Sequence, residues 1–199
     1  TRMRAIAPAP PSSEPSTPDY VVRMSRDFER ARRFTRMLYE IHAPLAERVA
    51  RILDMRSVER LLDLGGGSGV LSLSLLRANP RLTAVVVDIE SVCRAGREIA
   101  AENRLDERLV YHPADILEDP LPSGFDAVLE CDVNVFSESL FRKVRAALRP
   151  GGRFLIIDSF ASKPGVAPRS RAHWALVRSL SDPDIGYPTS DAVKALLVA

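Results

Sequence analysis

The segment from Asp63 to Gly69, with the sequence DLGGGSG, restricts the possible folds of this chain more than any other segment. It follows an apolar run at residues 61–64 and precedes a helical pattern at residues 70–78, which predicts a tight turn between a strand and a helix. Gly65, Gly67 and Gly69 let the backbone turn sharply and approach a ligand with no Cβ atom in the way, and the next helix offers free N–H groups. We therefore expect a small polar ligand across this turn. The alternative is a tight loop that binds nothing.

Short apolar runs alternate with helical patterns along the rest of the chain, as in proteins built from parallel βαβ units. Expected strands are residues 61–64, 82–88, 109–112, 125–131 and 153–158, and expected helices are residues 70–78, 91–103 and 137–148. Ser137 is a candidate cap, and residues 149–152 form a tight turn before the last strand. Further helices are expected near residues 172–180 and after Thr189 or Ser190. The pattern predicts an α/β fold with a Rossmann-like, doubly wound, mostly parallel sheet.

The region before the first strand divides into a tail and a helical segment. Residues 1–18 are rich in proline, serine and alanine, a composition that favours extended and mobile backbone. Residues 20–53 carry apolar side chains near the helical period, and Pro44 is expected to divide them into two helices. We therefore expect a flexible tail at 1–18, a helical lid at 19–55 and a ligand-binding domain at 56–199.

Composition excludes several classes of protein. The 199 residues carry a formal net charge of +2 with no concentrated basic face, so we expect no nucleic-acid partner. No apolar run approaches the roughly 20 residues that a membrane crossing needs, so no membrane association is expected. Cys93 and Cys131 lack the spacing of a disulfide framework or a metal site, which favours a reducing compartment, the cytoplasm, and no bound metal.

Two acidic residues follow later strands at positions that suit a nucleoside. Asp88 ends the second expected strand about 20 residues after the glycines, where an acid can accept hydrogen bonds from both ribose hydroxyls. Its alternative role is that of a helix-capping or loop acid. Asp115 follows the third strand and can accept from an adenine amino group, with Ile116 packing on the ring.

A nicotinamide dinucleotide is the rival ligand, because its fingerprint also follows the first strand and also contains spaced glycines. That fingerprint is G-x-G-x-x-G, whereas this chain has D-x-G-x-G-x-G from Asp63 to Gly69. The spacing argues against the dinucleotide.

Four motifs in order make the chain resemble class I S-adenosylmethionine-dependent methyltransferases over residues 20–199. They are the sequences LLDLGGGSG at 61–69, VVVDI at 85–89, FDAVL at 125–129 and LRPGGRFLIID at 148–158. The triple glycine, and Thr189 before a helix containing Leu196 and Leu197, resemble the small-molecule O-methyltransferases. The resemblance implies S-adenosylmethionine as cofactor and a small-molecule acceptor, with transfer to oxygen.

The resemblance also implies roles for individual residues. Gly65, Gly67 and Gly69 would line the methionine part of the cofactor, with Asp63 near its amino group. The ribose would be held by Asp88, with Ile89 beside it in the same motif, and the adenine by Asp115 and Ile116. Residues 130–132, which include Glu130, would face the methyl group at the carboxyl edge of the sheet.

The acceptor side is less defined by the sequence. Many of these O-methyltransferases have a histidine base just after the fourth strand, but residues 130–134 here are ECDVN, so Asp132 is the candidate base by position. His42, His112 and His173 are weaker candidates. Phe34, Met37 and Tyr39 are candidates to touch an apolar substrate, and the alternative for each is a core or dimer contact.

The family's closing β-hairpin has no counterpart after Thr189, so we expect the natural chain to continue past Ala199 or to have lost these strands here. Three functions stay open at this point: a small-molecule methyltransferase, a nicotinamide-dependent oxidoreductase, or a cofactor-binding subunit without activity. A homodimer is kept as the expected partner state.

Overall fold

The computed structural model describes residues 17–163 and 186–198. The expected tail is outside these ranges except for its last two residues. The helix expected near 172–180 and His173 also lie outside them.

A five-stranded sheet forms the centre of the molecule, and every neighbouring pair in it is parallel. Its order is β3-β2-β1-β4-β5, which reverses direction at β1. The strands are β1 (Arg60–Leu64), β2 (Thr83–Asp88), β3 (Leu109–Pro113), β4 (Phe125–Cys131) and β5 (Leu148–Ile157). The prediction of a doubly wound, mostly parallel α/β fold is confirmed.

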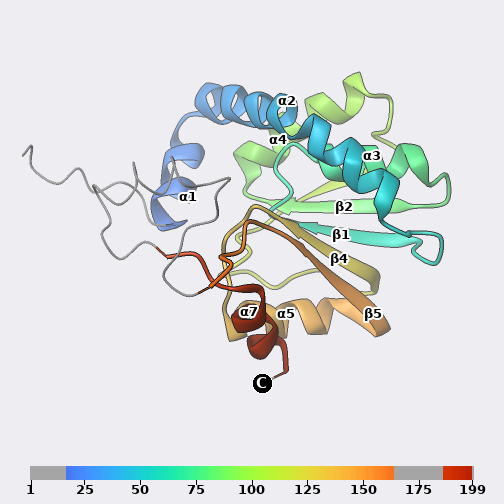
Figure 1. Cartoon of the computed structure of the whole chain (residues 1–199). Coiled ribbons are helices and arrows are strands. Elements are labelled where there is room, and N and C mark those ends of the chain that lie inside the picture. Colours follow the sequence, from blue (N-terminus) through green and yellow to red (C-terminus); the bar gives the residue numbers. More distant parts are fainter. Residues whose placement is uncertain (1–16, 164–185, 199) are drawn as a thin grey trace, which may run out of the picture.

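Helices cover both faces of the sheet (Figure 1). They are α1 (Thr17–Arg26), α2 (Phe28–Ile52), α3 (Val70–Ala78), α4 (Glu90–Glu102), α5 (Glu138–Ala147) and α7 (Ser190–Val198). Because successive strand residues point to opposite faces, Leu61 packs in the core with α2, α3 and α4, whereas Leu62 and Leu64 pack in a second core with α5. Both layers are buried, which explains the nearly continuous apolar runs of the strands.

The predicted break at Pro44 is wrong. Pro44 lies inside α2, and the break between the first two helices falls at Asp27, whose carboxylate accepts a hydrogen bond from the backbone N–H of Arg30 at 3.0 Å. Proline removes the hydrogen bond to the carbonyl of Glu40, but both residues lie on the exposed face, where water can satisfy that carbonyl. The boundary between α1 and α2 is therefore set by the N-cap at Asp27, whereas the exposed Pro44 does not interrupt the helix.

The predicted turn at residues 149–152 is part of β5. Leu148 pairs with Phe125 and Arg153 with Ala127, so the four residues between them bulge out of the ladder. The cap on the preceding helix is as expected: the Ser137 hydroxyl accepts from the backbone N–H of Leu140 at 3.3 Å. Thr189 caps α7 in the same way through the N–H of Ala192.

Helix α2 is joined to α4 by ion pairs and by packing. Arg32 donates to Glu98 at 2.7 Å, and Arg36 contacts both Glu98 and Glu102. Such exposed pairs contribute little stability individually. The apolar contacts matter more, because Ala46 and Val49 of α2 are buried in the same core as β1 and α3.

Both cysteines are free, as expected, with Cys93 buried in α4 and Cys131 at the end of β4. Within the described ranges, no helix has the length and the apolar content that crossing a membrane would require.

Gly96 in α4 tests the packing around Tyr111, the side chain that connects α4 to the glycine turn. Alanine normally stabilises a helix interior relative to glycine by about 1 kcal/mol, but a Cβ atom on Gly96 would collide with the ring of Tyr111, whose hydroxyl donates to the carbonyl of Ser68 at 2.9 Å. We expect Gly96→Ala to lower the free energy of unfolding by about 1–3 kcal/mol, measured by urea denaturation. Tyr111→Leu in a double-mutant cycle should remove most of this loss, and purely additive effects would contradict the assignment.

Candidate functional site

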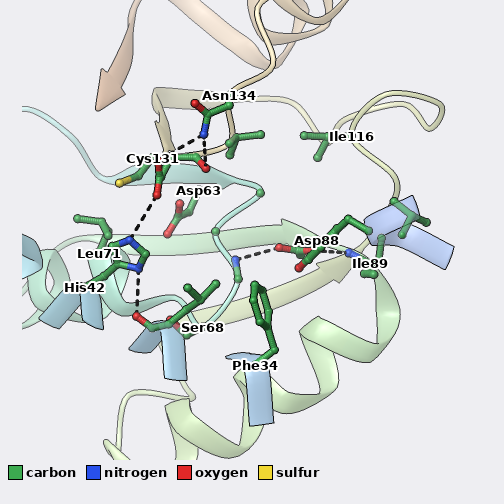
Figure 2. A pocket seen from close by; sticks show the side chains of 18 of the residues that line it. Phe34, His42, Asp63, Ser68, Leu71, Asp88, Ile89, Ile116, Cys131 and Asn134 are labelled. Atoms are coloured by element: carbon green, nitrogen blue, oxygen red, sulfur yellow. Dashed lines mark hydrogen bonds and ion pairs between the residues drawn. The ribbon is translucent and has the colours of Figure 1, made fainter. Parts of the chain in front are cut away.

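A cavity of about 620 Å³ opens at the carboxyl ends of β1, β2 and β4, where the direction of the strand order reverses. This is the place where open α/β sheets bind ligands. Its lining comes from α1 and α2, from the glycine turn, and from the segments that follow β2, β3 and β4. Figure 2 shows its two ends, one around Asp88 and Ile89 and the other around His42, Cys131 and Asn134.

The glycine turn, residues 65–69, forms part of the cavity wall, and its glycines have different structural roles. Gly65, Gly66 and Gly67 line the cavity. Gly65 has φ +63, and a Cβ atom there would lie 2.7 Å from Val133 of the segment after β4. Gly67 has φ +54 with open space beside it, so its backbone is accessible to a ligand. Gly69, predicted to bind cofactor, is outside the cavity lining; it is the N-cap of α3 and lies against Tyr111.

Asp88 ties the glycine turn to the end of β2. One carboxylate oxygen accepts from the backbone N–H of Gly67 at 3.0 Å and the other from that of Ile89 at 2.8 Å. Each oxygen keeps a second lone pair for a ligand in the cavity. Burial raises the pKa of Asp88 to about 6, although the two amides act in the opposite direction. Asp88 is therefore held in one orientation with both oxygens partly satisfied.

Asp63 lies on the other side of the same turn. Its carboxylate accepts from the Ser72 hydroxyl at 2.6 Å, and burial raises its pKa to about 6. A Cβ atom on Gly66 would lie 2.5 Å from the Asp63 carboxyl carbon, so the middle glycine is required by this acid. The sequence prediction did not assign Gly66 a role of its own.

The segment after β3 carries Asp115 and Ile116 into the cavity lining. Asp115 accepts from the backbone N–H of Leu117 at 2.9 Å, and its own N–H donates to Asp119 at 2.8 Å. The ammonium group of Lys143 on α5 donates to the backbone carbonyls of Ile116, Leu117 and Asp119. The Lys143 side chain therefore holds the segment after β3 in place through three hydrogen bonds, and no sequence motif indicated this role.

The segment after β4 places Asp132 in the cavity and Glu130 outside its lining. Glu130 is buried and accepts from the backbone N–H of Val133 at 3.0 Å, and burial raises its pKa to about 7. Asp132 has φ +59, and its Oδ2 lies 3.6 Å from Nε2 of His42. The structure therefore favours a positioning role for Glu130.

Of the three predicted substrate residues, only Phe34 lines the cavity. Met37 is 45% exposed on the outer side of α2, and Tyr39 donates its hydroxyl to Asn103, the C-cap of α4, at 3.2 Å. The structure also brings Tyr20 and His42 to the cavity. Tyr20 was not among the predicted site residues, and His42 was predicted only as a weaker candidate for the base. Burial, and then the charge of Asp88, raise the pKa of the Tyr20 phenol.

Lys143 provides a test of the segment that carries Asp115. Lys143→Met removes three hydrogen bonds to the backbone carbonyls of this segment. We therefore expect the backbone amides of Leu117 and Asp119 to exchange with solvent about tenfold faster. Hydrogen exchange followed by NMR measures this. The control is Arg142→Met on the same helix, because the Arg142 side chain is 75% exposed. Equal exchange in both variants would contradict the role of Lys143.

Comparison with known proteins is consistent with this geometry. Residues 19–180 match the family model of an O-methyltransferase domain. The 3-hydroxy-5-methyl-1-naphthoate 3-O-methyltransferase of Streptomyces sahachiroi is 36% identical over 162 residues, covering 78% of this chain and 45% of that protein. The L-tyrosine C(3)-methyltransferase of Streptomyces lavendulae is 32% identical over 127 residues, covering 61% of this chain and 35% of that protein.

Among solved structures, the S-adenosylmethionine-dependent methyltransferase SibL in its apo form is 28% identical, with a TM-score of 0.62. The alignment covers 78% of this chain and 48% of SibL. The chain thus spans about half or less of the length of the proteins that it matches.

Proposed function

Because this chain belongs to the family of O-methyltransferase domains, we propose that its cavity binds S-adenosylmethionine and that it transfers the methyl group to a hydroxyl of a small molecule. The predicted resemblance to class I methyltransferases of the small-molecule type is confirmed. S-adenosylmethionine is confirmed as the cofactor expected for the family. Family membership gives no support to the nicotinamide-dependent alternative.

The single observation that carries the proposal is the placement of two buried acids, Asp63 and Asp88, on either side of an accessible glycine turn. We assign the ribose hydroxyls to Asp88, whose two oxygens are already oriented by backbone amides. The methionine part fits along Gly65 to Gly67, with Asp63 near its ammonium group. Positive charge on this ligand matches the two carboxylates.

The adenine end of the cofactor fits between the segments after β2 and β3. Ile89 and Ile116 supply apolar surface, and Asp115 lines the cavity beside them. Phe34 packs in the same cluster as Ile89, so we assign it to the nucleoside rather than to the methyl acceptor. Tyr20 packs on Phe34 with ring centroids 5.9 Å apart and extends this cover.

The acceptor fits at the opposite end of the cavity, beside His42 and Asp132. Leu38, Leu71 and Val133 make this end largely apolar. The bound sulfonium supplies an activated methyl group, and the protein's task is to align the acceptor oxygen with it and to exclude water. We infer a hydroxylated aromatic acceptor, because the naphthoate methyltransferase is a relative and the lining is apolar. The tyrosine relative is named for transfer to carbon, so product NMR must establish the methylated atom.

Other expectations stay predictions. They are the lid boundary at residue 55, the homodimer, the absence of a nucleic-acid partner and the cytoplasmic location. Met37 and Ile41 are 45% and 60% exposed one helical turn apart on α2, which is compatible with a homodimer contact. A catalytically silent subunit would bind the cofactor but transfer no methyl group to any hydroxylated aromatic.

Asp88→Asn tests the cofactor assignment. It removes the charge that receives the ribose hydroxyls, so we expect S-adenosylmethionine to bind about 10- to 100-fold more weakly in isothermal titration calorimetry. Asp126→Asn is a matched control, because Asp126 also accepts from two backbone amides, those of Glu59 and Arg60, at the far end of the sheet. Binding of NAD without S-adenosylmethionine binding, or unchanged affinity in Asp88→Asn, would contradict the proposal.

The affinity should also depend on pH. Since burial raises the pKa of Asp88 to about 6, its carboxyl is protonated and a poorer acceptor below that pH. We expect the affinity for S-adenosylmethionine to rise from pH 5 to pH 7, with each of the two acids, Asp88 and Asp63, contributing up to about tenfold per unit below pH 6, in calorimetry at constant ionic strength. In Asp88→Asn this dependence should be reduced to the part due to Asp63, whose pKa is also about 6. An unchanged pH profile would show that Asp88 does not contact the ligand.

A further inference from the structure

We infer that His42 of α2 accepts the proton of the acceptor hydroxyl during methyl transfer, with Asp132 as the carboxylate that stabilises the protonated ring. This inference rests on the proposed function, and it assigns a base that comes from the helices before the sheet rather than from the segment after β4. Three observations support it: the orientation of the ring, the position of Asp132, and the chemistry of the other groups at this end of the cavity.

The orientation of the His42 ring leaves Nε2 as the basic nitrogen. Nδ1 lies 3.0 Å from the backbone carbonyl oxygen of Leu38, one turn earlier in α2. A carbonyl oxygen only accepts hydrogen bonds, so Nδ1 carries a hydrogen and donates it. In the neutral ring the lone pair is then on Nε2, which is the nitrogen that faces Oδ2 of Asp132.

Asp132 is held where it can stabilise a proton on that nitrogen. Its Oδ2 is 3.6 Å from Nε2 of His42, a distance at which a protonated ring and a carboxylate form an ion pair. The side chains are 21% and 23% exposed, and both line the cavity. Asp132 has φ +59, a conformation that aspartate and asparagine adopt more readily than most residues. The carboxylate of the residue that follows β4 thus faces α2.

Neighbouring groups at this end of the cavity suit the role less well. Burial raises the pKa of the Cys131 thiol to about 12, so it stays protonated near neutral pH. The Glu130 carboxylate is directed to the backbone N–H of Val133 and is outside the cavity lining. Asn134 donates its amide to the carbonyl of Asp132 and has no basic group. Asp63 also lines the cavity, but its carboxylate accepts from the Ser72 hydroxyl and is assigned to the ammonium group of the cofactor. Among the described residues at this end, His42 and Asp132 are then the groups left to take the proton of the acceptor.

The proposed step balances as follows. The acceptor oxygen forms a bond to the methyl carbon as the bond from that carbon to sulfur breaks, and the electron pair of the broken bond stays on sulfur. The hydroxyl proton moves to Nε2 of His42, which becomes an imidazolium paired with Asp132. The proton passes to solvent after the methylated product leaves, and His42 returns to its neutral form.

His42→Gln and His42→Ala in the full chain test the inference, with 3-hydroxy-2-naphthoate as the probe acceptor and mass spectrometry to measure product. We expect kcat to fall about 100-fold or more in both variants, with the affinity for S-adenosylmethionine changed less than about threefold. Added imidazole should restore part of the activity of His42→Ala, because it can occupy the space that the ring has left. His112→Gln, which removes a histidine of β3 outside the cavity lining, should retain wild-type kcat.

An acceptor that is already ionised separates proton removal from a structural role. With a nitro-substituted naphthol that is anionic in neutral buffer, the defect of His42→Gln should shrink to less than about tenfold, because no proton has to be removed. An equal defect with both acceptors, or wild-type kcat in His42→Gln, would overturn the assignment of His42 while leaving the proposed function intact. Failure of the wild-type chain to bind S-adenosylmethionine would overturn both.

Discussion

The hydrogen bond from the backbone N–H of Gly67 to the carboxylate of Asp88 is the contact on which the site depends. It exists because β1 and β2 are parallel neighbours, with Leu64 opposite Val87, so that the turn after β1 lies beside the acid that ends β2. Gly67 makes this contact with φ +54, a conformation that residues other than glycine rarely adopt, and it lines the cavity. One contact therefore fixes both the turn and the orientation of the acid.

This arrangement has an energetic cost that a bound cofactor would offset. Burial raises the pKa of Asp88 from 3.8 to about 6, so the folded protein is stabilised by protonation of this group at low pH, and this contribution is lost as the pH rises through about 6. The shift corresponds to about 3 kcal/mol, at the rate of about 1.4 kcal/mol per pKa unit. Asp63 and Glu130 carry similar shifts around the same cavity. A cationic ligand with hydroxyl donors reduces this cost, and this favours a sulfonium nucleoside over a neutral or anionic ligand.

Helix α2 packs against the core and also lines the cavity, and the helical period decides which of its residues face the core and which face the cavity. Phe34, Leu38 and His42 are four residues apart, so they share the face that lines the cavity. Met37 is one residue away from that row and is turned toward the exterior, while Tyr39 is turned toward α4. The sequence prediction selected apolar and aromatic residues by type. The helical period would have pointed to His42, had Phe34 been taken as the reference.

The sequence alone predicted the α/β fold and the order of its motifs along the chain, because these depend on local periodicity and on a turn that few residues besides glycine can form. It also selected Asp63, Asp88 and Asp115, which all line the cavity. It misjudged Pro44, because the cost of a proline in a helix depends on whether the freed carbonyl reaches water. Only the tertiary structure decided that Lys143 supports the segment carrying Asp115 and that His42 meets Asp132. These pairs are far apart in the chain, and packing brings them together through contacts that no local pattern encodes.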